Sequence, residues 1–212
     1  MKLAILCTDP THPVMPSLRR WRSEMEACGH AVSMHSDKST LTHGDLLFLV
    51  SCSQVVRATD RARFRTVLVL HASDLPKGRG MSPHVWAVLA GASEITVTAF
   101  EACDPVDSGD IWFKTVFSLE GHELLPEINE KLFEAELNLM TRAVDEALSV
   151  RPNPQVGEPD SLLRGRTPMD SRLDPDKTLA EQFELLRVVD NSRYPAFMDY
   201  RGHRYIIKID KG

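Results

Sequence analysis

The stretch VLVLHASDLPKGRG at residues 67–80 decides the fold prediction. Its leading apolar residues are typical of a strand buried in a parallel sheet, and they run directly into His71 and a loop rich in proline and glycine. A strand that deep in a sheet seldom ends in histidine for packing reasons alone. His71 is therefore a candidate functional residue, and the alternative is a structural histidine that only satisfies a neighbouring loop.

Short apolar runs and helical patterns alternate through the first half of the chain. The predicted strands, in chain order, are 2–7, 30–35, 45–51, 66–71, 95–102 and 110–119. The predicted helices are 17–29, 53–62, 83–91 and 123–149. Alternation of this kind is typical of a parallel sheet with crossover helices, so the fold class is α/β, with a Rossmann-like, mostly parallel sheet and flanking helices.

The composition changes at RPNPQVGEP (151–159), where proline and glycine predict a linker. We therefore predict a catalytic domain over residues 1–150 and a small C-terminal α+β extension over residues 151–212. The elements predicted in this extension are a helix at 177–189 and a hairpin of strands at 195–200 and 203–209.

Composition narrows the class of protein. The chain has 212 residues, a formal net charge of −5 and 42% hydrophobic residues, which is typical of a globular protein. It has no dense Lys and Arg patch, no long apolar run and no signal-peptide pattern, so neither nucleic acid nor membrane is a predicted partner. Its four cysteines are scattered without a C-x-x-C pair, which predicts reduced thiols, no metal site and a cytoplasmic location.

A second polar loop contains acidic residues that could pair with His71. The stretch CDPVDSGD (103–110) places Asp104, Asp107 and Asp110 between two predicted strands. These are ordinary turn residues, but a loop at a strand end is also where an acid can meet the histidine. An aspartate beside a histidine raises the pKa of the imidazole and fixes its tautomer, which suits general acid–base catalysis.

Together the two loops resemble the folate-dependent formyltransferases, a family that includes methionyl-tRNA formyltransferase and the nucleotide-sugar N-formyltransferases. The hallmark of that family is a strand ending N-x-H-x-S-x-L-P, a basic R-G and a later D-x-G loop. VLHASDLPKGRG (69–80) matches the His, Ser, Leu-Pro and Arg-Gly positions, and VDSGDI (106–111) matches the second element. The resemblance covers most of residues 1–150.

The resemblance implies a reaction and a co-substrate. N10-formyltetrahydrofolate would offer its formyl group to a neutral primary amine, and the tetrahedral intermediate would carry an oxyanion. His71, charged through a pairing with Asp107, would face that oxygen or take part in proton transfer from the amine. The pterin would be bound largely by main-chain groups, with Ser51, Cys52, Ser53 and Val106 as candidates.

Further residues are substrate candidates by their position. Lys77 and Arg79 flank the expected crevice and could hold phosphates, or they could be solvated loop cations. His12 follows the first strand and faces the same crevice if the sheet is parallel. The remaining candidates are Ser73 in the histidine loop, and Tyr194 and Phe197 in the tail, whose rings could stack on a sugar or base or pack in a core.

The tail narrows the class of acceptor that we expect. RTPMDSRLD (166–174) and the closing GHRYIIKI (202–209) resemble the extension of bacterial sugar N-formyltransferases. Members of that kind act on amino-sugars attached to a nucleotide, in pathways for surface polysaccharide. A tRNA-acting member would normally carry a larger C-terminal domain, so we expect a nucleotide-linked amino-sugar as the acceptor. The apolar strands of the second half are compatible with a homodimer.

One position departs from the family pattern. The Asn two residues before the histidine, which donates a hydrogen bond to the formyl oxygen, is Val69 here. Losing such a donor commonly costs on the order of 10²–10³ in rate. Two alternatives therefore stay open: a formyltetrahydrofolate hydrolase, in which Ser73, His71 and Asp107 form a triad or water is the acceptor, and a non-catalytic module that binds folate or a nucleotide-sugar.

Overall fold

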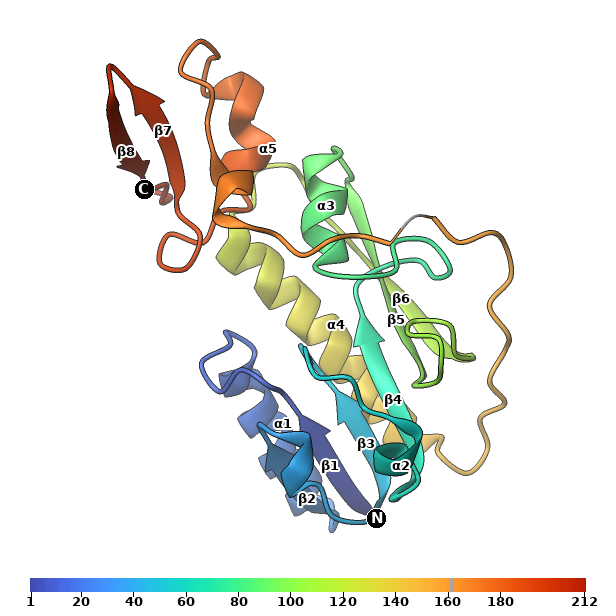
Figure 1. The fold of residues 1–212 in the computed structure, drawn as a ribbon. Helices are drawn as coiled ribbons and strands as arrows, with labels where there is room; N and C mark the ends of the chain where they lie inside the picture. Colours follow the sequence, from blue (N-terminus) through green and yellow to red (C-terminus); the bar gives the residue numbers. More distant parts are fainter. Residues whose placement is uncertain (161) are drawn as a thin grey trace.

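The central sheet of the protein is mixed and mostly parallel (Figure 1). The computed structural model describes residues 1–160 and 162–212. The sheet has the order β2-β1-β3-β4-β5-β6, in which β1 to β4 pair in parallel and β5 and β6 add antiparallel. Its strands are β1 (Lys2–Leu6), β2 (Ala31–His35), β3 (Gly44–Leu49), β4 (Phe64–His71), β5 (Glu94–Glu101) and β6 (Ile111–Ser118). The predicted fold class is confirmed.

Two of the predicted helices are much shorter than expected. The helices are α1 (Met15–Ala27), α2 (Ala58–Arg61), α3 (Pro83–Leu89), α4 (Leu125–Asp145) and α5 (Phe183–Leu186). The predictions at 53–62 and 177–189 were too long: only α2 forms in the first, and the second holds a 3₁₀ turn (Ala180–Gln182) followed by α5. Residues 53–62 contain few apolar side chains, whereas in 177–189 Leu186, Val188 and Val189 are buried without a continuous helix. Helices this short depend on tertiary packing.

The long helix α4 has a continuous stripe of buried apolar side chains. Leu132, Leu139 and Met140 lie on its buried face. It packs with α1 on one face of the sheet, where the Trp21 indole N–H donates to Thr141 Oγ1 at 2.9 Å. Side chains of a strand alternate between the two faces, so Leu68 and Leu70 of β4 point to this core, and Val67 and Val69 point to a smaller apolar cluster on the other face.

The C-terminal tail forms a small unit with its own core. Its hairpin consists of β7 (Ala196–Tyr200) and β8 (His203–Ile207), and Leu173, Leu186, Val189 and Ala196 are buried together beside it. Arg187 docks this unit, because its guanidinium is buried and donates to the main-chain oxygen and the carboxylate of Glu123 at 2.9 and 3.0 Å.

The stretch predicted as a linker is irregular chain, but it is not a free spacer. Asn153 pairs with Ile111, and Leu163 pairs with Gly80, so this stretch runs along the part of the protein formed by residues 1–150 (Figure 1). We call residues 153–160 and 162–163 the strap. None of the described helices combines the length and the apolar composition that a membrane crossing requires.

Candidate active site

His71 is the last residue of β4 and lies at the carboxyl edge of the sheet. It is 8% exposed, and its Nε2 lies 2.9 Å from the carbonyl oxygen of Gly78. Because a carbonyl only accepts hydrogen bonds, Nε2 carries the hydrogen, and Nδ1 of the neutral ring keeps its lone pair. The ring also meets Phe100 edge to face. This arrangement fixes the imidazole and leaves Nδ1 as the atom available for proton transfer.

Asp107 is buried close to the same loop, but it does not pair with His71. Its Oδ2 accepts a hydrogen bond of 3.0 Å from the main-chain N–H of Gly80. Within the described residues no hydrogen bond or ion pair joins Asp107 to His71, so the predicted pairing is wrong in this structure. Asp107 instead holds the loop two residues beyond Gly78, the partner of His71. The main chain of Asp107 is in the left-handed region, with a φ of 59°, which is a strained conformation common at functional sites.

The strap completes this loop arrangement. Gln155 donates from Nε2 to the main-chain oxygens of Asp107 and Gly109 at 3.0 and 2.9 Å, and its Oε1 accepts from Arg79 at 2.8 Å. Leu163 exchanges main-chain hydrogen bonds with Arg79 and Met81. Sequence reasoning missed both strap residues, because a stretch rich in proline and glycine carries no pattern that predicts its contacts.

The glycine in this loop is required by its surroundings. Gly80 has a φ of +109°, and a Cβ on it would lie 2.3 Å from the carbonyl oxygen of Leu163. Only glycine fits such a close approach of two main chains. The match of this chain to the Arg-Gly position of the resemblance therefore has a structural reason here.

The predicted pterin-binding residues surround the other face of β4. Val69 and His71 are two apart on the strand and share a face, and Cys52, Val69 and Ala102 each pack against the smaller apolar cluster. Ser51 has a φ of 47°, and the N–H of Ser53 donates to Thr8 Oγ1 at 2.9 Å, which fixes this loop. Burial raises the pKa of the Cys52 thiol, so it is a packing residue rather than a nucleophile.

These residues fit the pterin ring that the resemblance implies. The main-chain N–H groups of Cys103, Val106 and Asp107 donate to nothing within the described part of the chain. Val106 itself is 56% exposed. Free main-chain donors beside the half-buried apolar side chains of Cys52 and Val69 suit a flat heteroaromatic ring with a polar edge. Folate would therefore be held mainly by the loops after β3 and β5.

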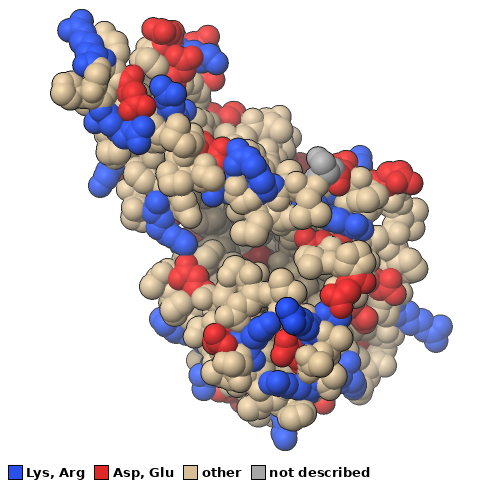
Figure 2. All heavy atoms as spheres, viewed as in Figure 1, with Lys and Arg blue, Asp and Glu red and all other residues tan. Residues whose placement is uncertain are grey.

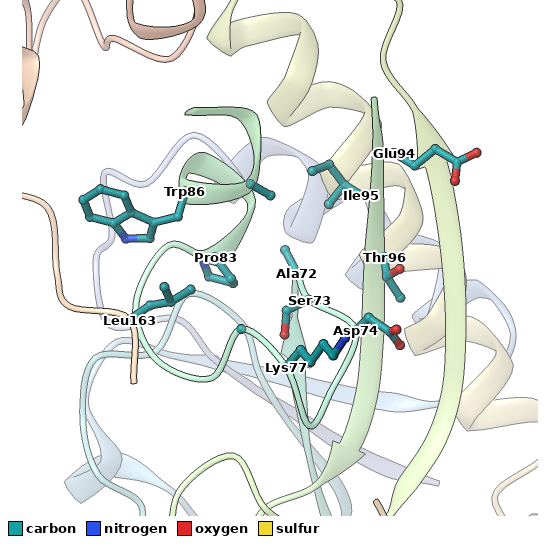
Figure 3. Close-up of a pocket in the computed structure, with 12 residues that line it drawn as sticks. Ala72, Ser73, Asp74, Lys77, Pro83, Trp86, Glu94, Ile95, Thr96 and Leu163 are labelled. Carbon is teal, nitrogen blue, oxygen red and sulfur yellow. The ribbon is translucent and has the colours of Figure 1, made fainter. Parts of the chain in front are cut away.

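Ser73 and Lys77 line a separate cavity of about 340 Å³ behind the histidine loop (Figure 3). It lies between α3 and the start of β5, with Trp86 and Thr96 in its wall, and neither His71 nor Asp107 lines it. The buried Ser73 hydroxyl has no hydrogen-bond partner among the described residues. A Ser-His-Asp triad needs a hydroxyl bonded to the imidazole, and this structure does not provide that contact.

The other substrate candidates make contacts within the protein. The Arg79 side chain is bonded to Gln155, so it is not the free loop cation that the sequence suggested. Phe197 is 4% exposed and lies under the guanidinium of Arg204, 4.0 Å from the ring centroid, which makes it a packing residue of the tail. Tyr194 is half-buried, and its carbonyl accepts from Ser171.

His12 lies just before α1 and is half-buried, and its Nδ1 accepts from the Val14 N–H at 3.2 Å. His84 is a further histidine, which the sequence analysis did not select. Burial, and then the positive charge of Arg193, lowers the pKa of His12. His84 is in the first turn of α3, and burial, with the nearby His12, His71 and Arg166, lowers its pKa to about 4. Figure 2 shows one face of the molecule, with a hollow near its middle that is bordered by both basic and acidic side chains.

The fold and this site define the class of protein. Residues 11–144 match the formyl transferase family, and the chain belongs to it. It is 30% identical over 138 residues to a methionyl-tRNA formyltransferase of Phocaeicola vulgatus, covering 60% of this chain and 41% of that protein. A methionyl-tRNA formyltransferase of Halorhodospira halophila is also 30% identical, over 66% of this chain and 46% of that protein. The chain thus spans less than half the length of these relatives.

Solved structures share the fold over nearly the whole chain. Methionyl-tRNA formyltransferase from Clostridium thermocellum has a TM-score of 0.81 at 24% identity, covering 96% of this chain and 90% of that one. A likely sugar N-formyltransferase from Mycobacterium tuberculosis has a TM-score of 0.73 at 18% identity, covering 98% and 96%. HypX from Aquifex aeolicus, in complex with tetrahydrofolic acid, has a TM-score of 0.80 at 17% identity, covering 99% and 37%.

These comparisons bear on two expectations. The family resemblance is confirmed, and the formyl donor of this family is N10-formyltetrahydrofolate. The expected link between tail size and acceptor stays a prediction: this chain covers 90% of a solved methionyl-tRNA formyltransferase chain, but less than half of the curated relatives of that name.

Proposed function

We propose that this protein is an N-formyltransferase that moves the formyl group of N10-formyltetrahydrofolate to the primary amine of a nucleotide-linked amino-sugar. The observation that carries the proposal is His71, whose Nε2 is anchored on Gly78 while Nδ1 is left for proton transfer. The sugar acceptor is supported by the tail motifs RTPMDSRLD and GHRYIIKI, and the structures that share the fold include a 4-N formyltransferase from Francisella tularensis, with a TM-score of 0.75 at 16% identity.

The residues of this chain would act as follows. When bound, N10-formyltetrahydrofolate supplies the electrophilic formyl carbon. His71 Nδ1 accepts the proton that the attacking amine must lose. The imidazole ring is already fixed, so it does not have to reorient for this transfer. Asp107 is a positioning residue, since it holds the Gly80 N–H and so the loop whose Gly78 carbonyl orients the imidazole.

Val69 occupies the position of the family's asparagine. Its side chain cannot donate a hydrogen bond, and the Gly80 N–H of the histidine loop is already bonded to Asp107. Stabilisation of negative charge on the formyl oxygen therefore falls to His71 once it is protonated, or to a free main-chain N–H of the loop after β5.

The test is direct formylation. The protein is incubated with N10-formyltetrahydrofolate and, in separate reactions, a panel of nucleotide-linked amino-sugars and methionyl-tRNA. We expect a mass gain of one CO on an amino-sugar and none on the tRNA, and loss of the gain in the His71→Asn variant. Gain on the tRNA alone would overturn the proposed substrate.

Two further outcomes identify the alternatives. Formate released without any acceptor would indicate the hydrolase, and folate binding without any reaction would indicate the non-catalytic module. The Val69→Asn variant separates a weak enzyme from an inactive one, because restoring the family's donor should raise a measurable rate by about 10-fold or more.

A further inference from the structure

A cavity of about 340 Å³ lies behind the loop that follows His71, and the candidate active site does not use it (Figure 3). Its wall comes from four segments: residues 72–78, α3, the start of β5 and Leu163 of the strap. The volume lies within the range of sites that hold small organic molecules, roughly 300–1,000 Å³. The apolar side chains of the wall are those of Ala72, Pro83, Ala87, Ile95 and Leu163. The cavity thus has room for a small ligand with an apolar body.

The polar groups of this cavity lie together at one end of it. Figure 3 shows the side chains of Ser73, Asp74 and Lys77 gathered below Ala72, whereas the carboxylate of Glu94 points away from them. The Ser73 hydroxyl oxygen is buried and has no hydrogen-bond partner among the described residues. A buried hydroxyl without a partner is unfavourable, so a ligand that bonds to it gains a contact that the protein does not supply.

The charge at the polar end of the cavity is positive. The carboxylate of Asp74 pairs with Lys114, whose Nζ also donates to the Leu75 carbonyl at 2.8 Å. Lys77 forms no ion pair within the described part of the chain, and its main-chain N–H donates to the Asp74 carbonyl at 3.0 Å. The ammonium of Lys77 is therefore the charge that remains without a counter-ion beside the free hydroxyl.

This combination of groups selects one ligand chemistry. One ammonium and one hydroxyl, with apolar walls opposite, match a carboxylate carried on a short apolar chain or ring. The phosphate that the sequence suggested for Lys77 fits less well. A diphosphate would bring two or more negative charges to a single cation, and it would leave the apolar part of the wall without a partner.

The cavity also contacts the segment that fixes His71. Gly78 lines it, and the Gly78 carbonyl accepts the hydrogen bond from His71 Nε2 at 2.9 Å. Ser73 packs against Gly78, because a Cβ added to Gly78 would lie 2.8 Å from Ser73 Cβ. Thr98 Oγ1 donates to the Ser73 carbonyl at 2.7 Å and so holds Ser73 from β5. A ligand bonded to Ser73 therefore lies against the turn that orients the imidazole.

We propose that this cavity is a regulatory binding site for a small organic carboxylate. Lys77 and Ser73 hold the carboxylate, and the apolar wall holds the body of the ligand. The bound ligand stabilises the loop conformation in which the Gly78 carbonyl is seated on His71, and so it acts on the candidate active site from behind. This site goes beyond the proposed function and does not depend on it.

The first experiment measures binding of benzoate by NMR titration, with benzamide as the neutral probe of the same shape and inorganic pyrophosphate as the competing chemistry. We expect benzoate to bind at least about 10-fold more tightly than benzamide, because only the carboxylate pairs with the Lys77 ammonium. Equal binding of the two, no binding of benzoate at millimolar concentration, or tighter binding of pyrophosphate through Lys77 would overturn the proposal.

Variants locate the bound benzoate. Lys77→Met keeps the length of the side chain and removes its charge, so benzoate affinity should fall about 10-fold or more, while Lys77→Arg should stay within a few fold of the wild type. The matched control is Lys2→Met, which changes an exposed lysine at the start of β1. Ala87→Leu adds atoms to the cavity wall from α3 and should exclude both probes. Unchanged benzoate affinity in Lys77→Met would refute the site, whether or not Ala87→Leu folds.

The second experiment tests the connection to His71 in the same titration. The imidazole ring signals of His71, assigned by their loss in His71→Asn, should shift along the binding curve of benzoate. The ring signals of the exposed His43 serve as control and should not move. This measurement needs no formyl transfer, so its outcome is independent of the proposed function. Benzoate binding that leaves the His71 signals in place would overturn the regulatory link.

Discussion

The histidine loop (72–81) and the tail (168–212) are both attached to the central sheet, but by different kinds of contact. The loop is held through main-chain groups: Leu163 bonds to Arg79 and Met81, and the Gly80 N–H donates to Asp107. The tail is docked through side chains: Arg187, whose guanidinium is buried, and the more exposed Arg193 and Lys211, which pair with Asp9 and Glu127.

This difference predicts what each region tolerates. Main-chain contacts survive most substitutions, so the loop is vulnerable where a side chain would force two backbones apart or where a reacting group is removed. The tail is vulnerable to the loss of one charge, because a buried ion left without its partner is strongly destabilising. The following predictions test this contrast, from the largest expected effect to the smallest.

His71→Asn should abolish most of the activity without unfolding the loop. The expected loss is about 10²–10⁴ in rate, the range for a group that transfers a proton in the reaction. Formyl transfer and thermal unfolding are measured together, with the exposed His43→Asn as control. A rate within a few fold of the wild type would mean that the candidate site is wrongly placed.

Arg187→Met should release the tail while the sheet stays folded. The side chains of Arg187 and Glu123 are each 2% exposed, and removing one partner of such a pair costs about 3–5 kcal/mol. Glu123 keeps Lys131 at 2.6 Å, so we expect the lower end of that range. Hydrogen exchange of β7 and β8 reports the release. Arg22→Met breaks an exposed pair with Glu26 and should cost at most about 1 kcal/mol. Equal effects of the two variants would contradict the contrast.

Gly80→Ala should destabilise the loop through its main chain. The left-handed φ and the clash with the Leu163 carbonyl together predict a loss of about 2–3 kcal/mol of unfolding free energy. Gly91 has a φ of +82° with no heavy atom within 4 Å of a built Cβ, so Gly91→Ala should lose about 1 kcal/mol. Denaturant unfolding compares the pair, and a larger loss at Gly91 would refute the role of the strap.

Acid should loosen the tail before the loop. Burial raises the pKa of Glu123, but hydrogen bonds from Lys131 and from the main chain outweigh it and lower that pKa to about 2, from 4.5. Below the unfolded value the unfolded chain takes up the proton first, so the stability that this carboxylate provides is present above about pH 4.5 and is lost as the pH falls towards 2.

The effect of acid is measured as stability against pH. Between about pH 7 and pH 3.5 the loss assigned to Glu123 is about 1 kcal/mol. Glu123→Gln removes the titrating group, so its curve should be flatter over this interval. A curve parallel to that of the wild type would show that another group controls the acid response.

The sequence by itself determined the order of strands and helices and the fold class, and it singled out His71 as the candidate reacting residue. Apolar runs such as 45–51 and 66–71 are local signals of burial, and a histidine at the end of such a run is exceptional enough to notice. The motif around Asp107 was equally visible, but its role was not. A sequence brings two polar residues to one loop region, and it does not say whether they bond to each other or to the main chain between them.

Only the tertiary structure decided those contacts. It gave His71 the Gly78 carbonyl as partner and Asp107 the Gly80 N–H, and it packed a proline-rich stretch, expected to be a linker, as the strap that holds both loops. The physical reason is that such partners are set by long-range packing of main chains, whose hydrogen-bonding groups are identical at nearly every residue and so leave no mark in the sequence.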